Sequence, residues 1–323
     1  MWRITNNLNQ GVLNRYADLI TSFFNLVINL SELDSIKEKL EEENFLEENF
    51  DGDDLLDKRL LKINKSANNQ FKPLVKSIIK LGSIKLNEEF EKYKEQNELV
   101  SNLNYNILQS DHPEPLKKVF KDYFYDKFFG VDWIWTDLVG ITFNREKFKT
   151  NFKEENELYV CPYCDSDTIS NTRNAWIEHF LPKGKYPYIS CNSKNLIPSC
   201  TSCNVSGSGK GEDVKNPIST QHHLQIGDEI EFNYEKGKIT IEKHDNEAID
   251  NFVELIKLRK RYNEESVQSN VISTLKVNYN TIDRLKKTNE FDKDMFFDFI
   301  HDMGRNRGYY FVQKNLLKFI DEL

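Results

Sequence analysis

Long apolar runs and cysteines are scarce in this sequence. No apolar stretch of the 323-residue chain approaches the roughly 18 residues that a membrane-spanning helix requires. The opening residues, MWRITNNLNQ, lack the basic segment and apolar core of a secretory signal peptide. We therefore expect a cytoplasmic protein without a membrane partner. Hydrophobic residues are 38% of the chain and aromatic residues 12%, which is enough for a packed core.

An excess of positive charge is also absent. The formal net charge is −8, whereas proteins that bind nucleic acid usually carry extra Lys and Arg to neutralise phosphates. Residues 31–60 hold twelve Asp or Glu and four Lys or Arg, so the rest of the chain is balanced. We interpret this acidic run as a solvated helix face or loop, with contact to a partner as the alternative. The segment 161–220 has six basic and five acidic residues, which leaves room for a local basic face.

Apolar residues at helical spacing predict helices on both sides of the middle of the chain. Residues 116–128 carry one apolar face at i, i+3, i+4, i+7, i+8 and i+12, with Pro115 near the start and Gly130 past the end. We expect further helices near residues 11–30 and from Phe71 to Tyr93. Helical spacing returns at residue 249, and the C-terminal region is expected to be helical with interruptions near Gly304 and Gly308.

The middle of the chain has a different composition. Residues 160–216 are rich in Cys, Gly, Pro, Ser and Asn, and such a loop-dominated segment usually needs a metal or a disulfide to fold. Residues 229–242 alternate as EIEFNYEKGKITIE, which predicts a β-hairpin with Gly237 at the turn. We expect an α+β, mainly helical chain. Its predicted domains are a helical region at 1–150, a central domain at 151–245 and a helical region at 246–323.

Four of the five cysteines form two C-x-x-C pairs. Each pair, Cys161 with Cys164 and Cys200 with Cys203, can present two thiolates from one tight turn to a tetrahedral ion. Disulfides are disfavoured in the cytosol, and a redox C-x-x-C would need a thioredoxin-like βαβ context that is missing. We therefore predict a structural Zn²⁺ site with four cysteine ligands. Cys191 is left over.

The residues between and beside the two pairs carry a resemblance. Trp176 to Lys183 reads WIEHFLPK, an Asn-Leu follows at Asn195, and Asn204 comes directly after the second pair. This order of an acid-His dipeptide, a Pro, an Asn-Leu and a C-x-x-C-Asn resembles the HNH family of ββα-metal nucleases over about residues 158–216. The pattern is similar, more closely, to the HNH nuclease subunit of Septu-type anti-phage defence systems, which works beside an ATPase.

The resemblance implies roles for four residues. His179 is expected to take a proton from the attacking water, since a neutral imidazole ionises near the working pH. Glu178 and the side-chain oxygen of Asn204 would bind a catalytic Mg²⁺ or Mn²⁺, because both are hard oxygen ligands. Asn195 takes the position that orients the imidazole in the family. Each has an ordinary alternative: a surface or core His, an exposed strand carboxylate, a helix cap at Asn204 and a turn residue at Asn195.

Some features depart from the family or stay open. The acid before His179 is Glu where many members have Asp, and the third position is Asn where others have His. The stretch after Asn204 is Gly-rich where a helix is expected. Two interpretations stay open for three lysines, which either contact phosphate or are ordinary surface residues: Lys183, Lys185 and Lys210. We also leave two interpretations open for the basic cluster at 257–261, which either contacts a DNA backbone or forms a solvated helix face. The cluster consists of Lys257, Arg259, Lys260 and Arg261.

The function that follows is a divalent-metal-dependent HNH endonuclease acting on DNA, within an anti-phage defence system. An ATPase subunit is the expected protein partner, and the helical N-terminal region would bind it. The alternative is a non-catalytic zinc-stabilised module that binds nucleic acid or protein. A secreted nuclease toxin is disfavoured, since no export segment is visible.

Overall fold

The structure is a computed structural model that describes most of the chain. The described residues are 1–32, 36–42, 70–169, 174–205, 209–235, 237–288 and 292–317. The chain divides into two compact units. Unit 1 comprises Met1–Thr5, Lys149–Glu178 and Ile197–Leu323, and unit 2 comprises Asn6–Phe148 and His179–Leu196. Over these described residues the structure is mainly helical with two small sheets, in agreement with the expected α+β class. The boundaries at 150 and 245 stay predictions, because compact units are not necessarily independently folding domains.

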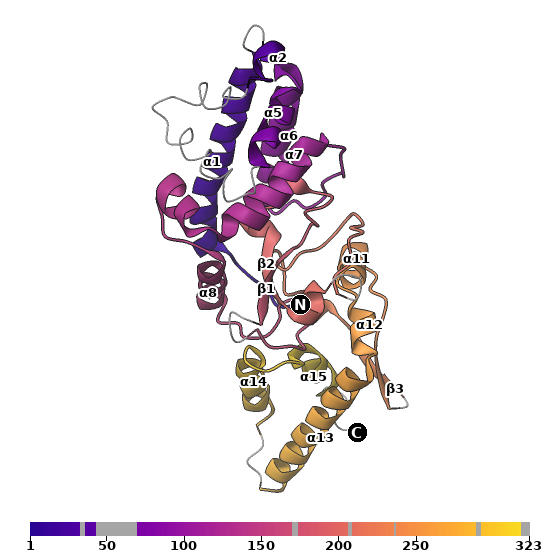
Figure 1. Cartoon of the computed structure of the whole chain (residues 1–323). Helices are drawn as coiled ribbons and strands as arrows, with labels where there is room; N and C mark the ends of the chain where they lie inside the picture. Colours follow the sequence, from indigo (N-terminus) through magenta and orange to yellow (C-terminus); the bar gives the residue numbers. More distant parts are fainter. Residues whose placement is uncertain are drawn as a thin grey trace. The chain divides into compact units, whose positions relative to one another are not determined.

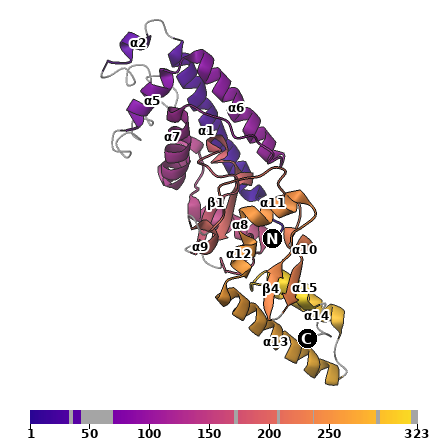
Figure 2. The ribbon, with the colours of Figure 1, turned by 90° about the vertical axis from the view of Figure 1, so that its right-hand side faces the viewer.

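Unit 2 is built on helix α1 (Asn7–Ser31), which was expected near 11–30 and starts a turn earlier. It packs beside α5 (Phe71–Ile79) and α6 (Ser83–Ser101), and Figures 1 and 2 show the three helices side by side. Aromatic rings fill the space between them. Phe24 of α1 stacks on Phe90 of α6, with 4.9 Å between ring centroids. The short helix α2 (Ile36–Lys39) is in the described part of the acidic run, whose residues 33–35 and 43–60 lie outside the description.

The prediction of one helix from Phe71 to Tyr93 is wrong. Two helices cover this segment, α5 ending at Ile79 and α6 beginning at Ser83. Between them Gly82 has φ +83°. A helix cannot continue through a positive φ, and glycine adopts that conformation at little cost because it has no Cβ. Gly82 was therefore the sequence signal for the break.

The apolar face predicted for 116–128 is confirmed, but its winding differs from a regular α-helix. The chain forms α7 (Glu114–Lys118), the π-helical η1 (Val119–Lys127) and a 3-10 turn, η2 (Phe128–Gly130). The six residues of the predicted face are all buried: Leu116, Val119, Phe120, Tyr123, Phe124 and Phe128. Tyr125 lies outside that face and is buried as well. Unit 2 continues with η3 (Ile134–Val139) and the start of α8 (Arg145–Asn156).

Two short strands hold the residues of the candidate site. β1 (Ala175–His179) pairs with β2 (Leu196–Cys200), and between them lie the 3-10 turns η4 (Pro187–Ile189) and η5 (Ser193–Asn195). α9 (Thr201–Asn204) follows β2 directly and has only four residues. The order is two strands and a helix, although the helix described after the second strand is much shorter than the family pattern implies.

The predicted hairpin is confirmed in unit 1. After α10 (Ile226–Glu229), β3 (Phe232–Glu235) pairs antiparallel with β4 (Lys238–Ile241), with Phe232 opposite Ile241. Gly237 at the turn has φ +80°. Phe232, Ile239 and Ile241 are buried, whereas Tyr234 remains 38% exposed. The hairpin therefore buries one face and leaves its end toward solvent.

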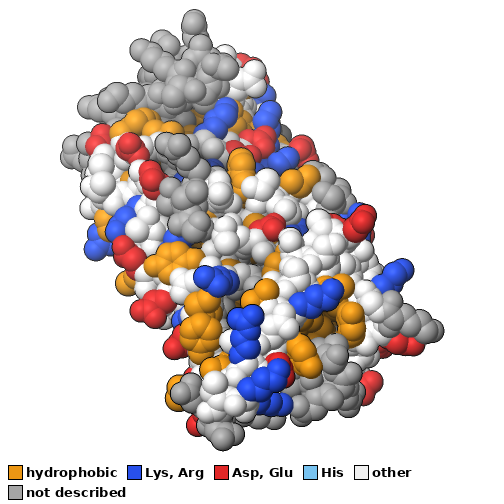
Figure 3. All heavy atoms as spheres, turned by 90° about the horizontal axis from the view of Figure 1, so that it is seen from below, with side chains coloured by type: hydrophobic (Ala, Val, Ile, Leu, Met, Phe, Trp, Pro, Cys, Tyr) orange, Lys and Arg blue, Asp and Glu red, His pale blue; other side chains and the backbone are white. Residues whose placement is uncertain are grey.

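Helices complete unit 1, as expected for the C-terminal region. They are α11 (Glu247–Leu255), α12 (Leu258–Tyr262), α13 (Glu265–Lys287), α14 (Lys293–Gly304) and α15 (Tyr310–Leu317). The expected interruption is confirmed, since α14 ends at Gly304 and α15 starts at Tyr310. None of the helices in the described ranges is long and apolar enough to cross a membrane. Lys and Arg side chains lie among hydrophobic ones over the lower half of the face in Figure 3.

Candidate metal centre and catalytic residues

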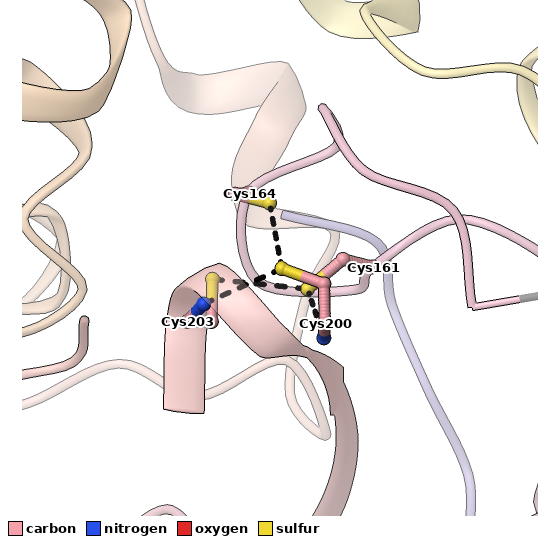
Figure 4. A group of neighbouring side chains, drawn as sticks. All are labelled: Cys161, Cys164, Cys200 and Cys203. Carbon is pink, nitrogen blue, oxygen red and sulfur yellow. Dashed lines mark hydrogen bonds between the residues drawn. The ribbon is translucent and has the colours of Figure 1, made fainter. Parts of the chain in front are cut away.

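The four paired cysteines converge in unit 1. Cys161 and Cys164 come from the loop after α8, while Cys200 ends β2 and Cys203 lies in α9 (Figure 4). Their sulfur atoms all lie within 4.8 Å of one another, and all four residues are buried. The Cys200 Sγ also accepts a hydrogen bond from the Cys203 backbone N–H, so the second pair closes the first turn of α9. Residues separated by about 40 positions thus form one cluster.

The spacing of the sulfur atoms fits a tetrahedral metal ion rather than disulfides. Cys161 Sγ lies 3.8 Å from Cys203 Sγ, and Cys164 Sγ lies 3.8 Å from Cys200 Sγ. A disulfide bond is only about 2.05 Å long, whereas thiolates bound at about 2.3 Å to one tetrahedral Zn²⁺ stand about 3.8 Å apart. The hydrogen bond with Cys161 and the other nearby thiols raise the pKa of Cys203. A divalent cation favours the thiolate forms, so these four residues can hold a metal ion such as zinc.

Arg261 of α12 contacts this cluster. Its guanidinium donates to Cys164 Sγ at 3.6 Å and to Cys200 Sγ at 4.0 Å, and the residue is only 8% exposed. Burial acts to lower the pKa of Arg261, but the nearby thiolates outweigh it and raise the pKa. A Zn²⁺ with four thiolates has two negative charges in excess, which a buried cation offsets.

The basic cluster at 257–261 therefore does not act as one surface. Arg261 faces the cysteines, which fits neither a DNA-tracking role nor a solvated helix face. Arg259 forms ion pairs with Asp250 and Glu254 and donates to a backbone carbonyl of β4. Two of the four basic residues thus have their charged groups engaged in contacts within unit 1. Spacing on a helix could not reveal this, because the partners come from distant segments.

Glu178 and Lys210 form an ion pair in unit 1. The Lys210 Nζ lies 3.6 Å from a Glu178 oxygen, and the lysine and glutamate side chains are only 3% and 18% exposed. Burial lowers the pKa of Lys210, while the charge of Glu178 acts in the opposite direction. The Lys210 backbone N–H donates to the Cys203 carbonyl at 2.8 Å, so the second cysteine pair helps to fix the position of this lysine.

His179 is the last residue of β1 and lies in unit 2, with its side chain buried. Its Nε2 atom is 3.0 Å from the backbone carbonyl oxygen of Ser190. A carbonyl oxygen only accepts hydrogen bonds, so Nε2 carries the hydrogen in this contact. Nδ1 is then the basic nitrogen of the neutral ring. The structure thus assigns to His179 the tautomer and the nitrogen that could take a proton.

Asn195 holds the loop that carries the Ser190 carbonyl. The Leu181 N–H donates to its side-chain oxygen at 2.7 Å, and its amide nitrogen donates to the carbonyls of Leu181 and Ile189 at 3.1 and 3.2 Å. Asn195 is fully buried. Ile189 immediately precedes Ser190, so the bond to the Ile189 carbonyl holds the peptide next to the one whose carbonyl faces His179. Orientation of the imidazole by Asn195 stays a prediction, for which these bonds supply an indirect route.

Sequence reasoning missed one residue that contacts His179 in unit 2 and a second residue that contacts the first. The ring of Tyr125 packs edge-to-face against the imidazole, with 4.2 Å between ring centroids. The Arg145 guanidinium lies over the Tyr125 ring at 4.5 Å from its centroid. Tyr125 does not belong to the predicted apolar face of its helix, and Arg145 stands in no motif. The position of Tyr125 depends on the winding of η1, which the spacing of apolar residues does not encode.

Comparison with known proteins gives two local similarities. The chain is 33% identical to Septu protein PtuB of Bacillus thuringiensis over a 93-residue alignment, which covers 25% of this chain and 34% of that protein. It is 44% identical to protein ea31 of Escherichia phage lambda over 50 residues, 16% of each. The matches thus span about a third and about a sixth of these relatives. No family model and no solved structure matches the chain.

Proposed function

We propose that this protein is a divalent-metal-dependent endonuclease of the HNH type, in which His179 is the general base. The observation that carries the proposal is the hydrogen bond from His179 Nε2 to the Ser190 carbonyl. It makes Nδ1 the proton acceptor in the neutral ring, and a general base needs such a fixed orientation toward its water. The resemblance of the Glu178-His179 strand and the two cysteine pairs to HNH nucleases supplies the reaction class.

The residues divide the chemistry between them. His179 accepts the proton of the attacking water, and the buried bonds of Asn195 keep the 181–195 loop in place. Glu178 and Asn204 would hold the catalytic Mg²⁺ or Mn²⁺, which neutralises charge on the phosphate and leaving oxygen. A carboxylate with an amide oxygen suits a hard ion, which would compete with the Lys210 ammonium for Glu178. Both proposed ligands of this ion, Glu178 and Asn204, belong to unit 1.

The cysteine cluster would be a structural zinc site in this proposal. All four ligand positions are taken by protein sulfur, so no open position is left for substrate. Its contribution is to fold the segment around β2 and α9. Asn204 follows Cys203 directly, so a bound ion would also fix the backbone that carries this proposed ligand of the catalytic metal.

The biological setting is proposed from the local similarity to the Septu protein. We infer that the protein acts in the cytoplasm against phage DNA, together with an ATPase partner of the kind that the resemblance implies. The similarity covers only part of that relative, and the partner therefore rests on the resemblance alone.

Plasmid cleavage tests the proposed activity. The parent protein should nick or linearise supercoiled DNA with Mg²⁺ or Mn²⁺ present and not without it. His179→Ala should lower the rate by at least about a hundredfold, because general-base catalysis contributes roughly that much or more. His223→Ala is the matched control, since His223 is an exposed histidine in unit 1. DNA binding without metal-dependent cleavage by the parent would favour the non-catalytic module instead.

A further inference from the structure

Two cations share one aromatic ring beside His179. The Arg145 guanidinium carbon lies 4.5 Å from the centroid of the Tyr125 ring, and the Lys183 Nζ lies 4.9 Å from the same centroid. Both distances are in the range of cation–π contacts. Another neighbour of this ring is the imidazole of His179, at 4.2 Å between centroids. All four residues belong to unit 2, so their arrangement is internal to one compact unit.

The local charge is positive although the chain as a whole is acidic. Asp126 forms the ion pair with Lys183, and its side chain is 43% exposed. Arg145 adds a second cation without an ion pair to a carboxylate among the described residues. The same three charges act on the buried Cys191 thiol. Burial raises the pKa of Cys191 to about 12; the positive charges of Arg145 and Lys183 lower this pKa, and the negative charge of Asp126 raises it. One carboxylate for two cations leaves room for an anion.

The two cations still have hydrogen-bond donors to offer. Arg145 Nη2 donates to the backbone carbonyls of Tyr125 and Asp126, at 2.7 and 3.4 Å. A guanidinium has five N–H donors, and Nε and Nη1 make no further hydrogen bond within the described ranges. The Lys183 side chain is 25% exposed, and its ion-pair partner Asp126 is open to solvent. A phosphate can therefore replace water on Arg145 and compete with Asp126 for Lys183.

We propose that Arg145 and Lys183 bind a phosphodiester group of the nucleic acid next to His179, with the Tyr125 ring as the platform that sets their positions. This inference rests on the proposed nuclease function, because it names the half of the site that holds the phosphate. Arg145 suits the role, since its planar donors match phosphate oxygens in pairs, and Lys183 adds a point charge. Tyr125 is a positioning residue that also fixes one side of the imidazole.

Binding of a short duplex without added divalent ion tests the phosphate site directly. The probe is a fluorescein-labelled 20-base-pair DNA, and its anisotropy is measured from 50 to 200 mM NaCl. Arg145→Gln and Lys183→Gln should each weaken binding by about tenfold, and each should lower the slope of log affinity against log salt by about one, because each removes one phosphate neutralisation. Lys147→Gln is the matched control: Lys147 is an exposed lysine on the same helix, two residues from Arg145.

Further variants separate a local effect on the phosphate site from unfolding. Arg145→Lys keeps the charge but removes the paired donors, so it should bind more weakly than the parent and retain the parent's salt slope. Tyr125→Phe keeps the platform and should bind like the parent. An unchanged affinity and salt slope in both Gln variants would overturn the inference, even if the parent cleaves DNA. A parent that binds as described but never cleaves would overturn the proposed nuclease and leave the phosphate site standing.

Discussion

At the residue scale, single side chains in this protein make contacts that their local sequence does not indicate. Arg261 belongs by position to a basic helix, yet its guanidinium faces Cys164 and Cys200. Asn195 belongs by position to a turn, yet it bonds to backbone groups of Leu181 and Ile189. In both cases a buried polar group requires partners, and the tertiary fold supplies partners that are distant in the chain.

Arg261→Gln should weaken metal retention by the cysteine cluster. The variant removes a cation that offsets the negative charge of a tetrathiolate site, and outer-shell substitutions typically lower metal affinity by about 10–100-fold. Zinc release into a colorimetric chelator such as 4-(2-pyridylazo)resorcinol measures the effect. Lys260→Gln, an exposed neighbour in α12, is the control and should release zinc at the parent's rate. Identical release by Arg261→Gln would show that the arginine is not needed as a counter-charge.

At the element scale, the pattern of apolar residues found the helices but not all of their ends or their winding. The face at 116–128 is buried as predicted, whereas the hydrogen bonds of η1 follow the wider π pattern. The hairpin at 232–241 could be predicted from the sequence because strand alternation and a glycine turn are both local signals. The break at Gly82 was equally local and was overlooked, since apolar residues continue on both sides of it.

Replacing either of two glycines of unit 2 by alanine should change the stability of the unit, with opposite signs at the two positions. Gly82 has φ +83° and open space where a Cβ would stand, so Gly82→Ala should destabilise the unit by about 1 kcal/mol through backbone strain alone. Gly11 lies within α1, also with open space around it, so Gly11→Ala should stabilise by about 0.5–1 kcal/mol. Urea denaturation followed by circular dichroism measures both. The same sign of change in the two variants would contradict the assigned break between α5 and α6.

At the scale of the whole molecule, only one of the two compact units contains residues of the cysteine cluster. All four cysteines lie in unit 1, in segments that the chain brings together from both sides of β1. Unit 2 has an aromatic core around α1, including Tyr16, Phe23 and Phe24, each at most 1% exposed. We therefore expect metal binding to contribute to the folding of unit 1 far more than to that of unit 2.

Metal removal should loosen unit 1 selectively. After treatment with a strong chelator, hydrogen exchange followed by mass spectrometry should rise over residues 159–169 and 197–205 and change little over α1 and α6. Cys203→Ser should reproduce the pattern without chelator, because it removes one ligand. Cys191→Ser is the matched control, since Cys191 is a buried cysteine of unit 2 outside the cluster. Equal loosening of α1 and α6 would show that the units do not respond separately.

The sequence by itself determined the helical and hairpin segments, the four cysteines of one cluster and the α+β class, because periodicity, turn residues and ligand spacing are properties of neighbours in the chain. Only the tertiary structure decided that Arg261 faces the cysteines, that Lys210 pairs with Glu178, and that Tyr125 packs against His179 with Arg145 over its ring. These contacts join residues tens of positions apart. Their physical cause is the requirement that each buried charge or polar group meet a partner, and no local pattern states which partner that is.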